Sequence, residues 1–230
     1  MDEYTGSVVR EHYAAHDVAR RYETKYEKGL LRRLSNRQEQ RALRALLKTI
    51  PWGGKVIDVA AGAGRMLPIL IDHFSDVTAA DGSEAMLEIV ARRFSDQAAR
   101  IHPMKAEAHR LPVPDASFDG VVSVRLIHHV HERARRVEIL AEFARVTRDW
   151  AIVSFFSSAT AAALRIRVMD RIRGRRSRSR VSLSPAELRG EAAEAGLEWV
   201  ESRAAAPLFS QHVIVLFRKV PKAVPAAGGR

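Results

Sequence analysis

The sequence predicts an α/β fold built around a doubly wound, mostly parallel sheet. Two observations lead to this prediction. Short β-branched runs alternate with segments of helical spacing from residue 55 to residue 156, and such alternation produces parallel βαβ units. The runs are also apolar on successive residues, as expected of strands that are buried on both faces. The crossovers should be right-handed.

The chain begins with a helical region. Residues 8–48 have helical spacing, with breaks expected at Gly29 and at the Ser35-Asn36 pair. A turn at residues 51–54 leads into the alternating region. Strands are expected at 55–60, 76–80, 99–105, 118–125, 151–156, 199–203 and 212–219, and helices at 64–74, 83–94 (capped by Ser83) and 131–147.

A further helix is expected after the last parallel strand. Ser184, Pro185 and Glu187 form a capping box with proline at the first helical position, and Gly196 should end the helix. We divide the chain into a helical cap at 1–50, a main domain at 51–219 and a flexible tail at 220–230. The longest uncharged run has 15 residues, fewer than the roughly 20 that span a bilayer. With a start unlike a signal peptide, this makes a cytoplasmic protein the expectation.

The composition excludes several classes of function. The 230 residues are 47% hydrophobic and 28% charged and contain no cysteine. Disulfide scaffolds, zinc-thiolate sites, iron–sulfur clusters and thiolate nucleophiles are therefore excluded. The 38 Lys and Arg against 27 Asp and Glu give a net charge of +11.

Most of this charge lies in one segment, residues 165–180, which we call the arm. Its eight arginines and one aspartate contribute +7 (8 − 1). The arm is either a solvated loop or an anion-binding lid for phosphate, carboxylate or acidic lipid headgroups. Nucleic acid is a third reading, but the arm has no aromatic residue for base stacking.

A turn with two glycines follows the first expected strand, in the segment VIDVAAGAGR at 56–65. Such a turn lets a ligand approach the backbone at the start of the next helix. A third glycine at the usual spacing is missing, which argues against a pyrophosphate-binding fingerprint. Asp81 ends the second strand, where a carboxylate can accept hydrogen bonds from two ribose hydroxyls. Glu107 and Ala108 end the third, where a carboxylate can accept from an adenine amine.

Three segments, VIDVAAGAGRM, VTAADGSEAML and AEAHRLPVPDASFDGVVSVRLIHHV, follow one another in this order. Together they resemble the class I S-adenosylmethionine-dependent methyltransferases, in particular the small-molecule branch with the ubiquinone and menaquinone C-methyltransferases. The resemblance extends over residues 56–156. It implies a Rossmann-like, seven-stranded sheet with its last strand inserted antiparallel, and S-adenosyl-L-methionine bound above the C-terminal strand ends.

The resemblance also implies roles for single residues. The glycine turn would pass the methionine and ribose part of the cofactor, and Asp58 would order that turn or reach the amino group through water. Met86 would pack near the ribose or in the helix core. Ala60 stands where the family usually has glycine, which adds one methyl group. The expected cofactor-binding residues are Asp58, Ala60, Ala61, Gly62, Gly64, Asp81, Gly82, Met86, Glu107, Ala108, Val124 and Tyr22.

Direct in-line methyl transfer needs a general base only when the acceptor is a hydroxyl or an acidic carbon. His128 and His129, with His131, are candidates after the fourth strand, although histidines there often bond backbone or face solvent. Arg125, expected on that strand, needs an anionic partner: the cofactor carboxylate, an anionic acceptor or a protein acid. Tyr22 is either a packing residue or a cover over the cofactor. We expect no metal site, because no histidine pair shares a helix face with a carboxylate.

We therefore expect a methyltransferase that acts on a small-molecule acceptor, with an anionic molecule, a lipid or a saccharide intermediate as the options. One alternative is a non-catalytic accessory protein that keeps the fold and binds the cofactor, for which Ala60 is the hint. Another is an RNA-directed methyltransferase, for which the arm is the hint. The chain lacks the Asn/Asp-Pro-Pro-aromatic motif typical of methylation of exocyclic base amines, which argues against nucleic acid as the acceptor.

Overall fold

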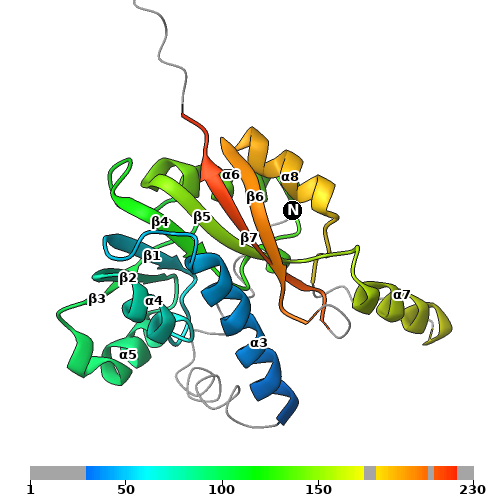
Figure 1. Cartoon of the computed structure of the whole chain (residues 1–230), viewed down its shortest axis with the longest axis horizontal. Helices are drawn as coiled ribbons and strands as arrows, with labels where there is room; N and C mark the ends of the chain where they lie inside the picture. Colours follow the sequence, from blue (N-terminus) through cyan, green and yellow to red (C-terminus); the bar gives the residue numbers. More distant parts are fainter. Residues whose placement is uncertain (1–29, 174–179, 207–209, 222–230) are drawn as a thin grey trace, which may run out of the picture.

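The computed structural model describes residues 30–173, 180–206 and 210–221 (Figure 1). Its helices are α3 (Leu30–Leu47), α4 (Leu67–His73), α5 (Glu84–Arg93), η1 (Ser95–Gln97), η2 (Ile127–His129), α6 (Arg133–Val146), α7 (Ala161–Arg173) and α8 (Pro185–Glu194). Its strands are β1 (Lys55–Val59), β2 (Asp76–Asp81), β3 (Ile101–Lys105), β4 (Phe118–Ser123), β5 (Thr147–Phe156), β6 (Leu197–Ala204) and β7 (His212–Lys219).

The seven strands form one sheet in the order β3-β2-β1-β4-β5-β7-β6. Strands β1 to β5 are parallel, while β7 is antiparallel to both β5 and β6. The strand order reverses between β1 and β4, the kind of switch point where ligands bind in open α/β sheets. The predicted α/β fold, with its seven-stranded, mostly parallel, doubly wound sheet and antiparallel last strand, is confirmed.

Helices cover both faces of the sheet (Figure 1), and each face carries its own apolar core. On one face α3, α4 and α5 pack on the sheet, and the α3 side chains Leu43 and Leu46 are fully buried. On the other face α6 and α8 pack together. Gly120 of β4 is required where Trp150 of β5 lies across it, because a Cβ there would come within 2.0 Å of the indole. The sheet is therefore packed against helices on both faces.

The predicted helix break at Ser35 and Asn36 is wrong, because α3 runs through both residues without interruption. The Ser35 hydroxyl donates to Glu39 Oε1 at 3.2 Å, and Asn36 Oδ1 accepts from Arg65 Nη1 at 2.7 Å. These polar side chains bind other side chains, so they do not compete with the helix backbone. The predicted helical region before residue 30 lies outside the described residues.

Several predicted boundaries also shift. Strand β4 ends at Ser123, so Arg125 lies in the following turn and not on the strand. Helix α4 begins three residues after Gly64, whose φ of 77° is not helical. The predicted 131–147 helix is α6, which spans only Arg133–Val146. Thr147 already belongs to β5, and its hydroxyl donates to the Asp119 carbonyl at 2.9 Å. Ser83 is the N-cap residue of α5 but makes no side-chain capping bond, whereas the capping box at Ser184 is confirmed.

Candidate functional site

The C-terminal ends of β1, β2, β3 and β4 meet at one edge of the sheet, because these strands are parallel neighbours. The glycine turn follows β1, Asp81 ends β2, Glu107 follows β3 and Arg125 follows β4. The fold thus brings four separate segments that carry predicted site residues to a single edge of the sheet, formed by the ends of β1 to β4 (Figure 1). Tyr22 lies outside the described residues.

The glycine turn has an unusual backbone. Ala60, Gly62 and Gly64 have φ angles of 62°, 54° and 77°. Glycine adopts this left-handed region without steric cost, whereas a side chain with a Cβ is strained there. Ala60 therefore carries strain at the position where the resemblance in sequence led us to expect glycine. The Ala61 N–H donates to the Ala80 carbonyl at 3.0 Å, which ties the turn to β2.

Asp81 holds this turn in place. Its Oδ2 accepts from the Gly62 N–H and its Oδ1 from the Ser83 N–H, each at 2.8 Å. Burial raises the pKa of Asp81, and the two backbone donors oppose this shift. Each carboxylate oxygen retains further acceptor capacity beyond its one backbone bond. The residue that we expected to bind the ribose is thus also an internal anchor of the turn.

Glu107 places a second carboxylate beside Asp81. It lies half-buried against Gly82, where an added Cβ would be 3.2 Å from Glu107 Oε1. Its charge contributes to the raised pKa of Asp81. Two neighbouring acceptors of this kind suit a ligand with hydroxyl and amine donors, as the adenosine part of S-adenosylmethionine has. The residues present therefore fit the cofactor that the sequence implied.

Several expected cofactor-binding residues make contacts within the protein interior. Met86 is buried on α5 and packs with Ala63 of the turn. Gly64 is required by packing, since a Cβ there would lie 2.8 Å from the side chains of Leu67 and Phe94. Val124 is buried in the α3–α5 core, and Ala108 packs at the margin of the α6–α8 core.

Asp58 is a buried carboxyl group on β1, directly before the turn. Burial raises its pKa to about 7, with the charge of Asp81 adding to the shift and that of Arg65 opposing it. A substantial fraction of the Asp58 carboxyl groups is therefore protonated at neutral pH.

The anionic partner of Arg125 is a protein acid, Glu39 of α3. Arg125 Nε donates to Glu39 Oε2 at 3.0 Å, and Nη2 contacts Oε1. Arg65 Nη1 donates to the same Oε2 at 2.8 Å. Glu39 is only 1% exposed. One buried carboxylate thus pairs with two arginines that come from the turns after β1 and β4.

His212 and Ser154 complete what we call the Glu39 cluster. His212 Nδ1 lies 3.2 Å from Glu39 Oε1, and Nε2 lies 2.9 Å from Ser154 Oγ. Ser154 Oγ also accepts from the backbone N–H of Arg125 at 2.7 Å, where Arg125 has a left-handed φ of 74°. Burial lowers the pKa of His212. Burial opposes ionisation of Glu39, but His212 together with Arg65 and Arg125 holds the pKa of Glu39 well below its usual range.

Sequence reasoning did not find Glu39, Ser154 or His212. A signal was present for Glu39, because it precedes Leu43 by one helical turn and so falls on the apolar face of the helix. A charged residue on such a face needs buried partners. Nothing comparable distinguishes Ser154 or His212 within their apolar strands.

His128 is buried and neutral. Its ring stacks on Phe156 at 4.0 Å with an interplanar angle of 7°, and among the described residues its Nδ1 has no hydrogen-bond partner. Burial, with the neighbouring His129, lowers the pKa of His128 to about 2. The His129 ring lies 4.3 Å from that of His128 and is half-buried, whereas His131 faces solvent.

Residues 56–149 match the model of a family described as a methyltransferase domain. Over 144 residues the chain is 36% identical to the demethylmenaquinone methyltransferase of Beutenbergia cavernae, covering 62% of this chain and 56% of the relative. Residues 56–149 thus form a class I S-adenosylmethionine-dependent methyltransferase domain. The domain is also 32% identical over 102 residues to mouse tRNA (carboxymethyluridine(34)-5-O)-methyltransferase ALKBH8, covering 44% of this chain and 14% of the relative.

Solved structures place the methyltransferase domain in the same fold class. Magnesium protoporphyrin IX methyltransferase from Synechocystis, solved with bound SAH, superposes with a TM-score of 0.76 at 15% identity. The match covers 93% of this chain and 99% of that one. By contrast, the chain spans little more than half of one curated relative named above and a seventh of the other. The acceptors in the names of these relatives differ in chemistry, so membership of the family leaves the acceptor open.

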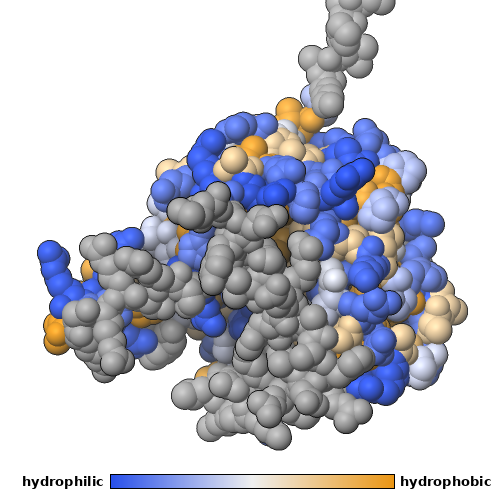
Figure 2. All heavy atoms as spheres, turned by 180° about the vertical axis from the view of Figure 1, so that it is seen from behind, coloured by the Kyte–Doolittle hydropathy of each residue, from blue (hydrophilic) through white to orange (hydrophobic). Residues whose placement is uncertain are grey.

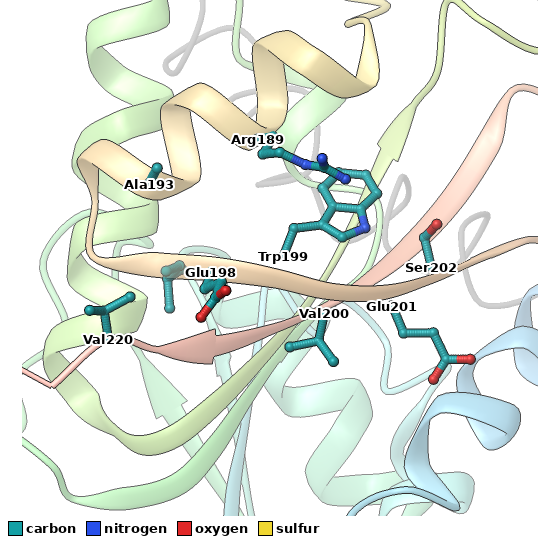
Figure 3. Close-up of a pocket in the computed structure, with 9 residues that line it drawn as sticks. Arg189, Ala193, Glu198, Trp199, Val200, Glu201, Ser202 and Val220 are labelled. Carbon is teal, nitrogen blue, oxygen red and sulfur yellow. The ribbon is translucent and has the colours of Figure 1, made fainter.

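A surface pocket of about 560 Å³ lies away from the candidate site, between α8 and the edge strand β6 (Figure 3). Arg189 lies over the Trp199 ring at 5.2 Å and forms one wall. None of the predicted site residues line it. In the part of the chain that the structure describes, no helix is long and apolar enough to cross a membrane.

Proposed function

We propose that this protein binds S-adenosylmethionine at the glycine turn and transfers a methyl group to a small-molecule acceptor. The observation that carries the proposal is the tie between Asp81 and Gly62, which sets the turn beside the carboxylates of Asp81 and Glu107. When bound, S-adenosylmethionine supplies an electrophilic methyl group on its sulfonium, so the difficult chemistry resides in the cofactor.

The protein's own residues then act by holding and aligning. Asp81 and Glu107 would accept hydrogen bonds from the ribose and adenine donors, and the turn from Ala61 to Gly64 would lie against the methionine part. Val124 and Arg125 would border the methyl group at the end of β4. Alignment of this kind contributes several kcal/mol to a displacement reaction.

His128 is proposed to orient the acceptor. Its neutral ring has an unpartnered Nδ1 at this edge of the sheet, which can exchange a hydrogen bond with a polar acceptor group. The pKa of about 2 makes His128 a weak proton acceptor. Where the acceptor must lose a proton, the less buried His129 is the better candidate for a general base.

A small-molecule acceptor is favoured over a macromolecule by the extent of the match. The demethylmenaquinone methyltransferase aligns over 62% of the chain, well beyond the 94 residues from 56 to 149 that match the family model. Arg125 and Arg65 both already pair with the Glu39 carboxylate within the protein, although this single negative charge offsets only one of their two positive charges. These two arginines are therefore not proposed to bind an acidic acceptor.

An RNA acceptor is the second candidate. It is supported by the similarity to a tRNA methyltransferase and by the arginines of the arm. If it holds, RNA binding should depend strongly on salt and be lost when Arg173, Arg175, Arg176 and Arg178 are changed to glutamine. If RNA binding is absent or does not depend on salt, the small-molecule acceptor is the one candidate that remains.

Calorimetric titration with S-adenosylmethionine tests the cofactor site. We expect binding in the micromolar range by the unmodified chain and by Gly190→Ala, an exposed helical change remote from the site. Asp81→Ala removes the carboxylate that anchors the turn, and Gly62→Arg places a long side chain at a residue whose φ of 54° favours glycine. Each should weaken binding at least about tenfold. Glu107→Ala keeps the hydrogen bond between Gly62 and Asp81 and should weaken binding only through the lost contact with adenine. Unchanged affinity in Asp81→Ala and Gly62→Arg would refute the site assignment.

The accessory-protein alternative makes a separate prediction. A protein that only binds the cofactor would give the same titrations but no methyl transfer to any member of a broad acceptor panel. Methyl transfer to one quinol, phenol or amine acceptor, lost together with cofactor binding in Asp81→Ala, would exclude it.

A further inference from the structure

Helix α7 exposes an unusual number of apolar side chains. Nine large hydrophobic residues are exposed within the described part of the chain, and five of them lie on α7. Leu164, Val168 and Ile172 are 63%, 49% and 74% exposed and follow one another at intervals of four residues. They therefore form one stripe along the helix. Contiguous exposed apolar surface of this kind marks an interaction surface.

Arginines border this stripe on both sides. At 3.6 residues per turn, Arg167 and Arg171 flank one side of the stripe and Arg165 the other, and all three are exposed. Asp170 is the one acidic residue of the helix. Arginine can lay its aliphatic stem along apolar surface while its guanidinium reaches a polar boundary. In Figure 2 hydrophilic and hydrophobic side chains accordingly lie side by side on the projecting helix at the left.

The helix projects from the body of the molecule, but the chain leaves the sheet before α7 and returns to it after the arm at one place (Figure 1). It leaves at Phe156, the C-terminal end of β5. It returns where the Val181 N–H donates to the His128 carbonyl at 2.8 Å and the Leu183 N–H to the Phe156 carbonyl at 2.9 Å. Arg180 lies 5.5 Å from the centre of the Phe156 ring. The base of the arm is thus part of the candidate site's edge.

We propose that α7 docks on an anionic membrane surface, with the apolar stripe at the boundary of the acyl chains and the arginines on lipid phosphates. A helix with an apolar stripe and basic flanks binds such surfaces by both contributions together. Nucleic acid would engage the arginines but leave the stripe in water. A second copy of the chain would bring the same positive charge against this helix.

Docking on a membrane would set the site's edge beside the lipid. Because the chain after the arm returns to His128 and Phe156, the base of a membrane-bound α7 would lie at the end of β5, on the same edge of the sheet as the proposed cofactor site. An acceptor dissolved in the membrane would then have a short path to the site. The docking itself does not depend on the proposed activity, so each can fail without the other.

Vesicle co-sedimentation with the full chain tests the proposal. The probes are vesicles of phosphatidylcholine alone and vesicles that also contain phosphatidylglycerol. The stripe variant is Leu164→Gln, Val168→Gln and Ile172→Gln, which keeps good helix formers. The charge variant changes Arg165, Arg167 and Arg171 to glutamine. Matched controls are Leu34→Gln with Val220→Gln, two other exposed apolar residues, and Arg37→Gln, Arg41→Gln and Arg44→Gln, exposed on α3.

We expect binding to the anionic vesicles and little to the neutral ones. The charge variant should lose about a hundredfold in partitioning, since each arginine near an anionic surface contributes about 1 kcal/mol. The stripe variant should lose about tenfold or more although its charge is unchanged. Both control variants should bind as the unmodified chain does, and all variants should keep its melting temperature, because the changed side chains are exposed.

Three results would overturn the proposal. The first is no binding to the anionic vesicles. The second is equal losses in the α3 charge control and the charge variant, which would show a general electrostatic effect. The third is unchanged vesicle binding in the stripe variant. If that variant also binds RNA like the unmodified chain and the charge variant does not, the arm is an RNA-binding element.

Discussion

Replacing Glu39 by alanine tests whether the buried ion cluster holds the site's edge together. The change removes the carboxylate that pairs with Arg65 and Arg125 and lies 3.2 Å from His212 Nδ1. Arg65 and Arg125 then lose the one carboxylate that they share at the end of the sheet. Breaking a buried ion pair by removing one partner costs about 3 to 5 kcal/mol.

The structure favours the lower end of this range. The side chains of Arg65 and Arg125 are 14% and 25% exposed, so water can partly solvate them when Glu39 is absent. We therefore expect Glu39→Ala to lower the free energy of unfolding by about 3 kcal/mol. In a domain of this size that corresponds to a fall in melting temperature of about 6 to 12 °C.

Urea unfolding and thermal scans measure this effect. Glu138→Gln is the matched control, because Glu138 pairs with Arg135 at the surface, with side chains 51% and 45% exposed. It should cost less than about 0.5 kcal/mol. The triple change of Glu39, Arg65 and Arg125 to leucine should recover much of the loss, because it leaves no charge unpaired.

The pH dependence gives a second measurement on the same residue. The pKa of Glu39 is held well below its usual range in the folded state. Its contribution is therefore present above the unfolded pKa of about 4.3 and is lost as the pH falls further. Glu39→Gln should flatten the acid limb of the stability curve. The reasoning is refuted if Glu39→Ala unfolds within about 0.5 kcal/mol of the unmodified chain.

Two further predictions concern the turn and the strand before it. Gly64→Ala should destabilise by about 2 to 3 kcal/mol in urea unfolding, because φ is 77° and the new Cβ would lie 2.8 Å from Leu67 and Phe94. As the control, Gly190→Ala places its new Cβ in open space on α8 and should stabilise by about 0.5 to 1 kcal/mol. If both changes altered the free energy of unfolding equally, the packing role of Gly64 would be contradicted. With a folded pKa of about 7, Asp58 costs stability as the pH rises from about 4 to 7. Asp58→Asn should lack this decline and be more stable at pH 8 by about 2 to 4 kcal/mol. Urea unfolding at a series of pH values measures this, and parallel stability curves for the variant and the unmodified chain would contradict it.

The sequence predicted the sheet well because its signals are local. A run such as residues 212–219 is apolar on successive residues, and β7 has the same bounds. The capping box is equally local, since its two hydrogen bonds join Ser184 and Glu187, three residues apart. Such patterns need no knowledge of the rest of the fold.

Long-range pairing lay outside the reach of the sequence. Arg125 was expected to need an anion, but the sequence left the cofactor carboxylate, an anionic acceptor and a protein acid all open. Its partner Glu39 stands 86 residues away, and only the packing of α3 on the sheet brings them together. Backbone strain was equally hidden, because nothing in the local sequence predicts a left-handed φ at Ala60 or Arg125.

The Glu39 cluster connects α3 to two segments of the proposed cofactor site. Arg65 follows the glycine turn, and Arg125 follows β4, so each is attached to a segment that would border the cofactor. Both are held by one carboxylate on α3, and Ser154 of β5 fixes the Arg125 backbone through its N–H. A shift of α3 would therefore move both segments together. Changes that weaken α3 packing without touching the turn, such as Leu43→Ala in its buried face, should consequently weaken cofactor binding as well as stability.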